Sequence, residues 1–206
     1  MISEARICAL RQQVETRMSE KRFRHTLGVE KLSAWLGGLV MPDKVSELRC
    51  AALLHDIAKE LSFEELTALL NASDMNITDE DRETPTVFHA FAAPVVIKRD
   101  FPEFATEDIL SATFNHTTGA PDMSLFDEII FISDFAEEGR EYPACREILK
   151  RLVDRCGGET DRESCILGIH KTAYDTVLAV ISALERLGRR INSRTLLTRS
   201  AFAVKI

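Results

Sequence analysis

Hydrophobic residues recur at every third or fourth position along most of the chain, which is the period of an amphipathic α-helix. No stretch alternates between apolar and polar residues for long enough to indicate a β-strand. We therefore expect an all-α fold. The pattern predicts helices over residues 2–18, 22–37, about 42–60, 63–70, 87–99, 106–115, 122–137, 144–156, 161–188 and a short one from about 193.

Capping and turn residues mark several of these boundaries. Ser62 followed by Glu65 has the spacing of a capping box and predicts the start of a helix. Glycines 37–38 indicate the end of the second helix, and the Pro-Asp pair at 42–43 indicates the start of the third. The polar segment 71–81 is typical of a loop.

The chain shows no internal repeat and no low-complexity linker. Its one weak point, Cys-Gly-Gly at 156–158, is better explained by a turn between helices than by a domain boundary. A chain of 206 residues can bury a sizeable core without disulfides or metals to brace it. We therefore expect a single domain over residues 1–206.

Composition narrows the class of protein. Hydrophobic residues make up 45% of the chain and charged residues 29%, as in ordinary soluble globular proteins. The formal net charge of -7 argues against binding to nucleic acid or to an anionic membrane, since both favour basic surfaces. A small polyanionic substrate is still compatible, because a local basic pocket or a metal ion can outweigh the overall charge.

The cysteines and the N-terminus indicate a cytoplasmic protein. The five cysteines are an odd number without CxxC spacing, which favours reduced thiols over a disulfide framework. The N-terminal residues lack the basic-then-apolar order of a signal peptide. No apolar run approaches the length of a membrane span.

The segment AALLHDIAKE, residues 51–60, places His55 and Asp56 in its most apolar surroundings. Burying both groups is costly unless a cation compensates, so the pair indicates metal ligation inside a helical bundle. Asp134 poses the same problem in the apolar segment DEIIFISDFAEEG, because a buried carboxylate needs a partner. Further imidazoles on other predicted helices could point toward the same centre: His25, His89 and His116.

A lone histidine on an apolar helix is more often a hydrogen-bonded core residue than a ligand. His170 has no acidic or motif context, and we predict a structural role for it. Asp122 and Glu128 are expected to be solvated helix acids.

Four segments resemble the YqeK branch of the HD-domain phosphohydrolase superfamily over about residues 10–200. They are RFRHTLGV (22–29), LLHDIAKE (53–60), FHAFAAPVV (88–96) and NHTTGAPDMSLFDEIIFISDFAEEGREYP (115–143). They reproduce the H…HD…D order of that superfamily, with the two additional histidines of its two-metal subgroup. Glu138 stands where the family usually has proline, and the Ala92-Ala93 region lacks a glycine common there. Neither departure replaces a ligand.

The resemblance implies a single HD-type helical bundle with a core over about 18–140 and C-terminal helices over about 144–204. It implies symmetrical cleavage of diadenosine tetraphosphate into two ADP by a hydroxide bridging two divalent ions. Four imidazoles and two carboxylates suit divalent transition metals better than magnesium. The resemblance implies iron as the expected metal, with manganese as a substitute. Asp56 would bridge the ions, and Asp56 and Lys59 would be catalytic. The implied metal ligands are His25, His55, Asp56, His89, His116 and Asp134.

Several residues near these ligands are candidates for binding phosphate. Lys59 follows Asp56 by three residues and so shares its predicted helix face, which favours phosphate binding over the alternative of a solvent-facing lysine near the helix end. Arg140 is either a phosphate clamp or a partner of the helix dipole. The residues after His116 could donate to phosphate or simply form a capped turn. The full set of predicted phosphate-binding residues is Arg22, Lys59, Thr117, Thr118, Gly119 and Arg140.

The sequence contains no fingerprint for a nucleobase pocket. Four aromatic residues are candidates for stacking on a base, although aromatic residues on helices more often belong to the core: Phe88, Phe91, Phe101 and Tyr142. The implied partner is a small-molecule nucleotide, without nucleic acid or membrane, and a homodimer through the helix at 161–188 is an open alternative. Two other functions also stay open. One is a different HD-type nucleotide phosphatase, pyrophosphohydrolase or phosphodiesterase, and the other is a non-catalytic nucleotide-binding regulator.

Overall fold

The computed structural model describes residues 2–73, 75, 77–158 and 160–205. The described residues form eleven α-helices and three short 3-10 helices, with no strand, so the predicted all-α fold is confirmed. The α-helices are α1 (Glu4–Glu15), α2 (Glu20–Val40), α3 (Val45–Leu54), α4 (Phe63–Asn71), α5 (Asp79–Arg82), α6 (Phe88–Asp100), α7 (Glu107–Asn115), α8 (Leu125–Ala136), α9 (Pro143–Cys156), α10 (Arg162–Arg186) and α11 (Ser193–Lys205). The 3-10 helices are η1 (Pro42–Lys44), η2 (Pro85–Val87) and η3 (Pro102–Phe104).

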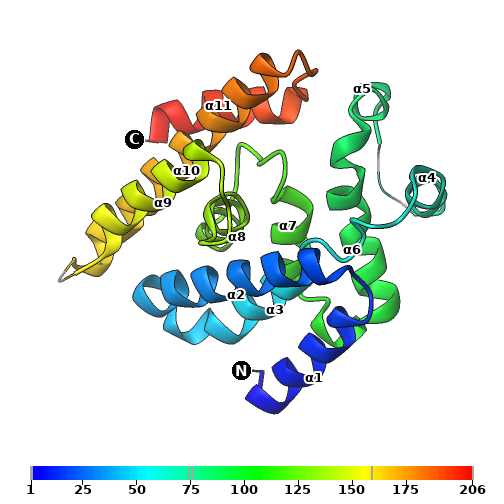
Figure 1. Ribbon diagram of the computed structural model, residues 1–206, viewed down its shortest axis with the longest axis horizontal. Coiled ribbons are helices and arrows are strands. Elements are labelled where there is room, and N and C mark those ends of the chain that lie inside the picture. Colours follow the sequence, from blue (N-terminus) through cyan, green and yellow to red (C-terminus); the bar gives the residue numbers. More distant parts are fainter. Residues whose placement is uncertain (1, 74, 76, 159, 206) are drawn as a thin grey trace.

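Helix α8 occupies the middle of the fold (Figure 1). It packs against α2, α3 and α7 on one side and against α9 and α10 on the other. Helices α4 to α6 lie on the far side of α7, where α6 packs against both α4 and α7. This arrangement brings the ends of α3 and α7, the start of α6 and the middle of α8 toward a common centre.

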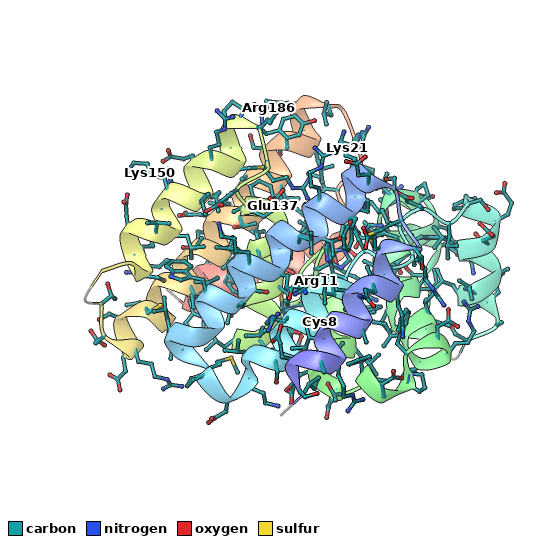
Figure 2. The ribbon with its side chains drawn as sticks, turned by 60° about the horizontal axis from the view of Figure 1, so that its bottom comes forward. Cys8, Arg11, Lys21, Glu137, Lys150 and Arg186 are labelled. Atoms are coloured by element: carbon teal, nitrogen blue, oxygen red, sulfur yellow. The ribbon has the colours of Figure 1, made fainter. Side chains whose placement is uncertain are left out.

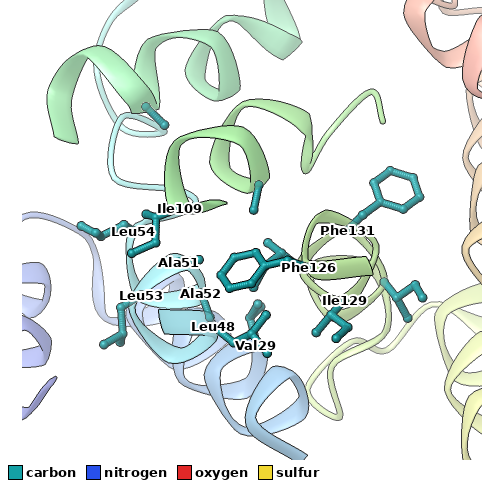
Figure 3. Close-up of a cluster of buried hydrophobic side chains, with 14 of the residues drawn as sticks. Val29, Leu48, Ala51, Ala52, Leu53, Leu54, Ile109, Phe126, Ile129 and Phe131 are labelled. Carbon is teal, nitrogen blue, oxygen red and sulfur yellow. The ribbon is translucent and has the colours of Figure 1, made fainter. Parts of the chain in front are cut away.

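The core follows from the amphipathic pattern of the helices. Buried apolar side chains from α2, α3, α7 and α8 interlock in one cluster (Figure 3). Burying a valine, leucine, isoleucine or phenylalanine side chain stabilises the fold by about 1.5–3 kcal/mol. The labelled members of this cluster are Val29, Leu48, Ala51, Ala52, Leu53, Leu54, Ile109, Phe126, Ile129 and Phe131.

The structure tests two helix boundaries that were predicted in the N-terminal half of the chain. The capping box of Ser62 and Glu65 is confirmed and starts α4. The second helix does not end at glycines 37–38 but continues to Val40. A β-carbon at Gly37 would lie 2.5 Å from Leu48 Cδ1, so this glycine allows α2 and α3 to pack closely. The polar segment 71–81 predicted as a loop includes the last residue of α4 and the first three residues of the short helix α5, and its residues 74 and 76 lie outside the described residues.

The prediction of one helix through residues 42–60 is wrong at its C-terminal end. Helix α3 ends at Leu54, and residues 55–60 form successive turns. Backbone bonds between residues three apart replace the α-helical ladder there, with Ile57 N donating to Leu54 O and Lys59 N to Asp56 O. The chain therefore presents His55 and Asp56 at the end of a helix instead of in its middle.

Among the described residues, no helix combines the length and apolar character that a membrane crossing would require.

Candidate metal centre

The six predicted ligands come together from five helices that are far apart in the sequence. His25 comes from α2, His89 from the start of α6 and His116 from the end of α7. They surround His55 and Asp56 at the end of α3 and Asp134 on α8. Potential ligand atoms of His25, His55 and Asp134 lie within 4.8 Å of one another, and so do those of His55, Asp56 and His116.

The distances define two adjoining halves of this centre. In one half, His25 Nε2 lies 2.9 Å from Asp134 Oδ1, and His55 Nε2 lies 3.7 Å from the same oxygen. In the other half, Asp56 Oδ1 lies 3.3 Å from His89 Nε2 and 3.5 Å from His116 Nε2. His55 Nε2 is also 3.5 Å from Asp56 Oδ2, so His55 connects the two halves.

Each of the four imidazoles has a hydrogen-bond acceptor beside its Nδ1 atom. The Nδ1 atoms of His55, His89 and His116 lie 2.6, 3.0 and 2.7 Å from backbone carbonyl oxygens three residues earlier. His25 Nδ1 instead lies 3.2 Å from the Glu137 carboxylate. When Nδ1–H donates to such an acceptor, the lone pair of Nε2 is free to bind a cation. Four Nε2 atoms are therefore directed at two carboxylates.

The chemistry of this donor set fits divalent metal ions. His55 and Asp56 are buried, and His55 Nε2 and Asp56 Oδ1 have no hydrogen-bond partner among the described residues. Leaving such atoms unsatisfied costs about 1–3 kcal/mol each. Borderline transition metals bind imidazole and carboxylate together, so a cation at these atoms would satisfy both groups.

The two aspartates carry negative charge at the centre. Burial raises the pKa of Asp56, but His55, His116 and Lys59 outweigh burial and hold that pKa well below its usual value. Burial likewise raises the pKa of Asp134, but the hydrogen bond with His25 and the nearby His55 and Arg140 outweigh burial and hold that pKa well below its usual value. Burial lowers the pKa of His55, yet the two carboxylates raise it to about 10. The pair of acids thus favours a positive charge at His55 Nε2, which a proton or a metal ion can supply.

Three predicted phosphate-binding cations lie around the aspartates. Arg22 Nη1 is 2.7 Å from Asp56 Oδ2, and Arg140 Nη2 is 2.8 Å from Asp134 Oδ1. Lys59 Nζ is 3.9 Å from Asp56 Oδ1 and 2.9 Å from His89 Nε2. Burial lowers the pKa of Lys59, partly offset by the aspartates. All three side chains are partly exposed, so they can also meet a ligand at the mouth of the centre.

The residues that follow His116 divide into two groups. The Thr117 hydroxyl lies 3.2 Å from His89 Nε2 and is therefore part of the centre. The Thr118 side chain is buried, and its hydroxyl donates to Gly119 O. Gly119 has φ +68°, and a β-carbon there would lie 2.7 Å from Thr198 on α11. The Gly119 N–H donates to Asn115 O at 2.8 Å, so the Thr118 hydroxyl and the Gly119 N–H both form bonds within the turn, which supports a structural role.

Two other polar residues that the sequence analysis considered, His170 and Glu128, lie outside the metal centre. His170 is not in the centre, and its Nδ1 is 2.6 Å from Glu128 Oε2. The prediction of a solvated Glu128 is wrong, because this side chain is fully buried between α8 and α10. The candidates Phe88, Phe91 and Phe101 are buried core residues, which corrects the idea that they stack on a base, and Tyr142 is 72% exposed.

Sequence reasoning missed Glu137, which is buried next to α2 (Figure 2). Its other oxygen accepts the N–H of Gly139 at 2.6 Å. Gly28 leaves room for this carboxylate, since a β-carbon there would lie 2.2 Å from Glu137 Oε2. The signal in the sequence is an acid three residues after Asp134, next to Glu138, where the chain departs from the family pattern.

An all-α fold that gathers histidines and aspartates in the order H…HD…H…H…D is typical of one class of metal-dependent hydrolases. The HD domain family matches residues 22–156, and the chain belongs to this family.

The names of similar proteins also indicate hydrolases. The chain is 30% identical over 158 residues to a symmetrical bis(5'-nucleosyl)-tetraphosphatase of Halalkalibacterium halodurans, covering 76% of this chain and 79% of that protein. It is 30% identical over 137 residues to the Bacillus subtilis protein of the same name, covering 66% and 72%. A solved structure from Clostridium acetobutylicum, described as a predicted HD superfamily hydrolase involved in NAD metabolism, matches with a TM-score of 0.81. That match has 26% identity and covers 100% of both chains.

Proposed function

We propose that this protein is a metal-dependent hydrolase that cleaves diadenosine tetraphosphate symmetrically into two ADP. The observation that carries the proposal is the common orientation of four histidines. Each of them holds an acceptor through Nδ1 and directs Nε2 at the pair Asp56 and Asp134. Support for the substrate comes from the relatives named symmetrical bis(5'-nucleosyl)-tetraphosphatase.

The proposed cofactors are two divalent transition-metal ions, with iron expected and manganese as a substitute. Their ligands would be His25, His55, Asp56, His89, His116 and Asp134. Bound divalent ions in such a site lower the pKa of water and neutralise charge on phosphate oxygens. Asp56 contacts groups of both halves of the centre, which supports its proposed role as the residue shared by the two ions.

The residues of this chain would act on the charges of the substrate. A tetraphosphate chain carries several negative charges, and cleavage leaves two ADP anions. Lys59, Arg22 and Arg140 face the mouth of the centre, where their N–H groups can move from the aspartates to phosphate oxygens. Thr117 adds a hydroxyl donor beside His89. These donors would stabilise the charge that develops on the leaving phosphate.

Product analysis tests this proposal. The protein, purified without oxygen, is incubated with diadenosine tetraphosphate, and the nucleotides are separated by chromatography. ADP as the sole product is expected, whereas ATP with AMP, or free phosphate, would contradict symmetrical cleavage. Asp56→Ala should abolish turnover, and full activity in that variant would contradict a metal centre built on this aspartate.

A second candidate is an HD-type hydrolase acting on another nucleotide. The description of the Clostridium acetobutylicum neighbour names NAD metabolism, which favours dinucleotides related to NAD as further substrates to test. Turnover of such a dinucleotide without turnover of diadenosine tetraphosphate would select this candidate.

A further inference from the structure

A cavity of about 360 Å³ opens beside the metal centre. Its volume falls within the range of about 300–1,000 Å³ that is usual for small-molecule sites, at the lower end. It can therefore hold part of a nucleotide. Lys59 and His89 form the wall shared with the centre, and the remaining lining residues come from α4, η2 and the α10–α11 turn: Leu66, Pro85, Thr86 and Arg189.

Arg189 differs from the other cations near the centre because it has no acidic partner. Within the described part of the chain, its side chain makes no ion pair or hydrogen bond, and it is exposed. The adjacent Arg190 is instead paired with Glu83. An exposed guanidinium at the wall of a cavity that ends at a phosphate-type metal centre is suited to bind phosphate oxygens in pairs.

The turn that carries Arg189 is fixed in place. Gly188 adopts φ +60°, and Arg189 N donates to Leu184 O at 2.9 Å. Beyond the turn, the buried Asn192 donates to Asp81 Oδ1 and to Thr84 Oγ1, both at 2.9 Å. These bonds tie the turn to the segment that leads into η2.

The start of α11 adds a second anchor. The Arg194 guanidinium lies over the rings of Phe91 and Phe114, at 5.3 and 5.2 Å from their centroids. These rings belong to α6 and α7, the helices that also carry His89 and His116. The α10–α11 turn and the segment leading into η2, which both reach the cavity, are thus connected through the buried Asn192, and such ordering reduces the entropy lost when a ligand binds.

We propose that this cavity is the subsite for one nucleoside diphosphate half of the substrate, with Arg189 binding its phosphates. The inference rests on the proposed function, because cutting the middle of a tetraphosphate leaves one half extending away from the centre. Lys59 lies between the centre and the cavity, so a phosphate chain can pass from the metal ligands along Lys59 to Arg189. Leu66 and Pro85 provide apolar lining against which the nucleoside can pack.

Steady-state kinetics of Arg189→Ala with diadenosine tetraphosphate tests the subsite. Losing a hydrogen bond to a charged partner at an exposed site is expected to raise KM about tenfold, and kcat should change less than about twofold. The KM of Arg189→Lys should fall between that of Arg189→Ala and that of the wild type, because lysine keeps the charge without the paired N–H donors. Arg186→Ala is the matched control, since Arg186 is an exposed arginine one turn earlier that does not line the cavity.

Three results would overturn the inference: an unchanged KM in Arg189→Ala, a loss confined to kcat, or an equal rise in KM in Arg186→Ala. Calorimetric titration of ADP separates this inference from the proposed function. Should the wild type fail to cleave diadenosine tetraphosphate, the proposed function fails. The subsite still predicts ADP binding that weakens about tenfold in Arg189→Ala. Equal ADP binding by the two proteins, or none by the wild type, would refute the subsite.

Discussion

Glu137→Ala should weaken metal binding while leaving the fold intact. The Glu137 carboxylate is the acceptor that orients His25, with Oε1 3.2 Å from His25 Nδ1. Burial raises the pKa of Glu137, but the hydrogen bonds from His25 and the Gly139 N–H outweigh it and hold the pKa below its usual value. The group is therefore ionised at neutral pH. Its removal frees the His25 ring to rotate and makes Nε2 a poorer ligand.

The expected magnitude follows from this one contact. A hydrogen bond to a charged group contributes about 1.5–3 kcal/mol, which corresponds to a change of roughly 10- to 150-fold in a binding constant. Residues that orient metal-bound histidines typically contribute 10- to 100-fold in affinity or activity. We therefore expect Glu137→Ala to lower metal affinity by about 10- to 100-fold, and Glu137→Gln by less, since the amide oxygen can still accept from His25.

Gly28→Ala should also lower metal affinity, because it disturbs the contact between Glu137 and His25 from α2. The new β-carbon would lie 2.2 Å from Glu137 Oε2 and 2.9 Å from its carboxyl carbon, so the carboxylate must move away from His25. Glu138→Ala is the matched control. Its carboxylate is 68% exposed and pairs with the equally exposed Lys31, an interaction that contributes at most about 1 kcal/mol.

Metal affinity is measured by competition with a chromophoric chelator under anaerobic conditions, and circular dichroism confirms that each variant is folded. Wild-type affinity in a folded Glu137→Ala variant would refute the reasoning. An equally large loss in Glu138→Ala would also refute it, because the effect would then be one of local charge.

The remaining predictions concern stability, substrate handling and metal loading. His170→Asn should keep activity within about twofold but lower the free energy of unfolding by about 1–3 kcal/mol, since it removes a partner of the buried Glu128. Urea unfolding measures this, and a collapse in rate would place His170 in the catalytic machinery. Lys59→Ala should lower kcat/KM for diadenosine tetraphosphate by roughly 100-fold with unchanged metal content. Loss of metal in that variant would instead assign Lys59 to the integrity of the centre. Adding metal at about 100 times its Kd to stripped protein should raise Tm by roughly 5–11 °C, and an unchanged Tm in calorimetry would contradict tight binding to the folded state.

Periodicity predicted the long helices well because their buried faces are continuous. Helices α9 and α10 begin and end within two residues of the predicted limits. The third helix was predicted too long, because the apolar pattern continues past Leu54 while the backbone changes to turns. The hydrophobic pattern is the same on both sides of Leu54, so it cannot mark this change of backbone.

The gathering of the six predicted ligand residues could be predicted because all six match a family motif, and because His55, Asp56 and Asp134 stand among apolar neighbours. The surrounding residues could not, because their roles depend on partners distant in the sequence. Glu137 acts on His25 from the end of α8, and Arg189 lines the cavity because Asn192 ties the α10–α11 turn to the segment that leads into η2. The local sequence predicts that Glu128 is a surface acid, but in the fold His170 of α10 pairs with it and the side chain is buried.

Metal titration of the stripped wild-type protein tests the central claim most directly. Iron(II), or manganese(II) in a parallel series, is added stepwise, and the rate of ADP formation from diadenosine tetraphosphate is followed. The account predicts that activity rises with bound metal and reaches its maximum at about two ions per chain. Full turnover in metal-free protein, or failure to bind metal at all, would contradict it.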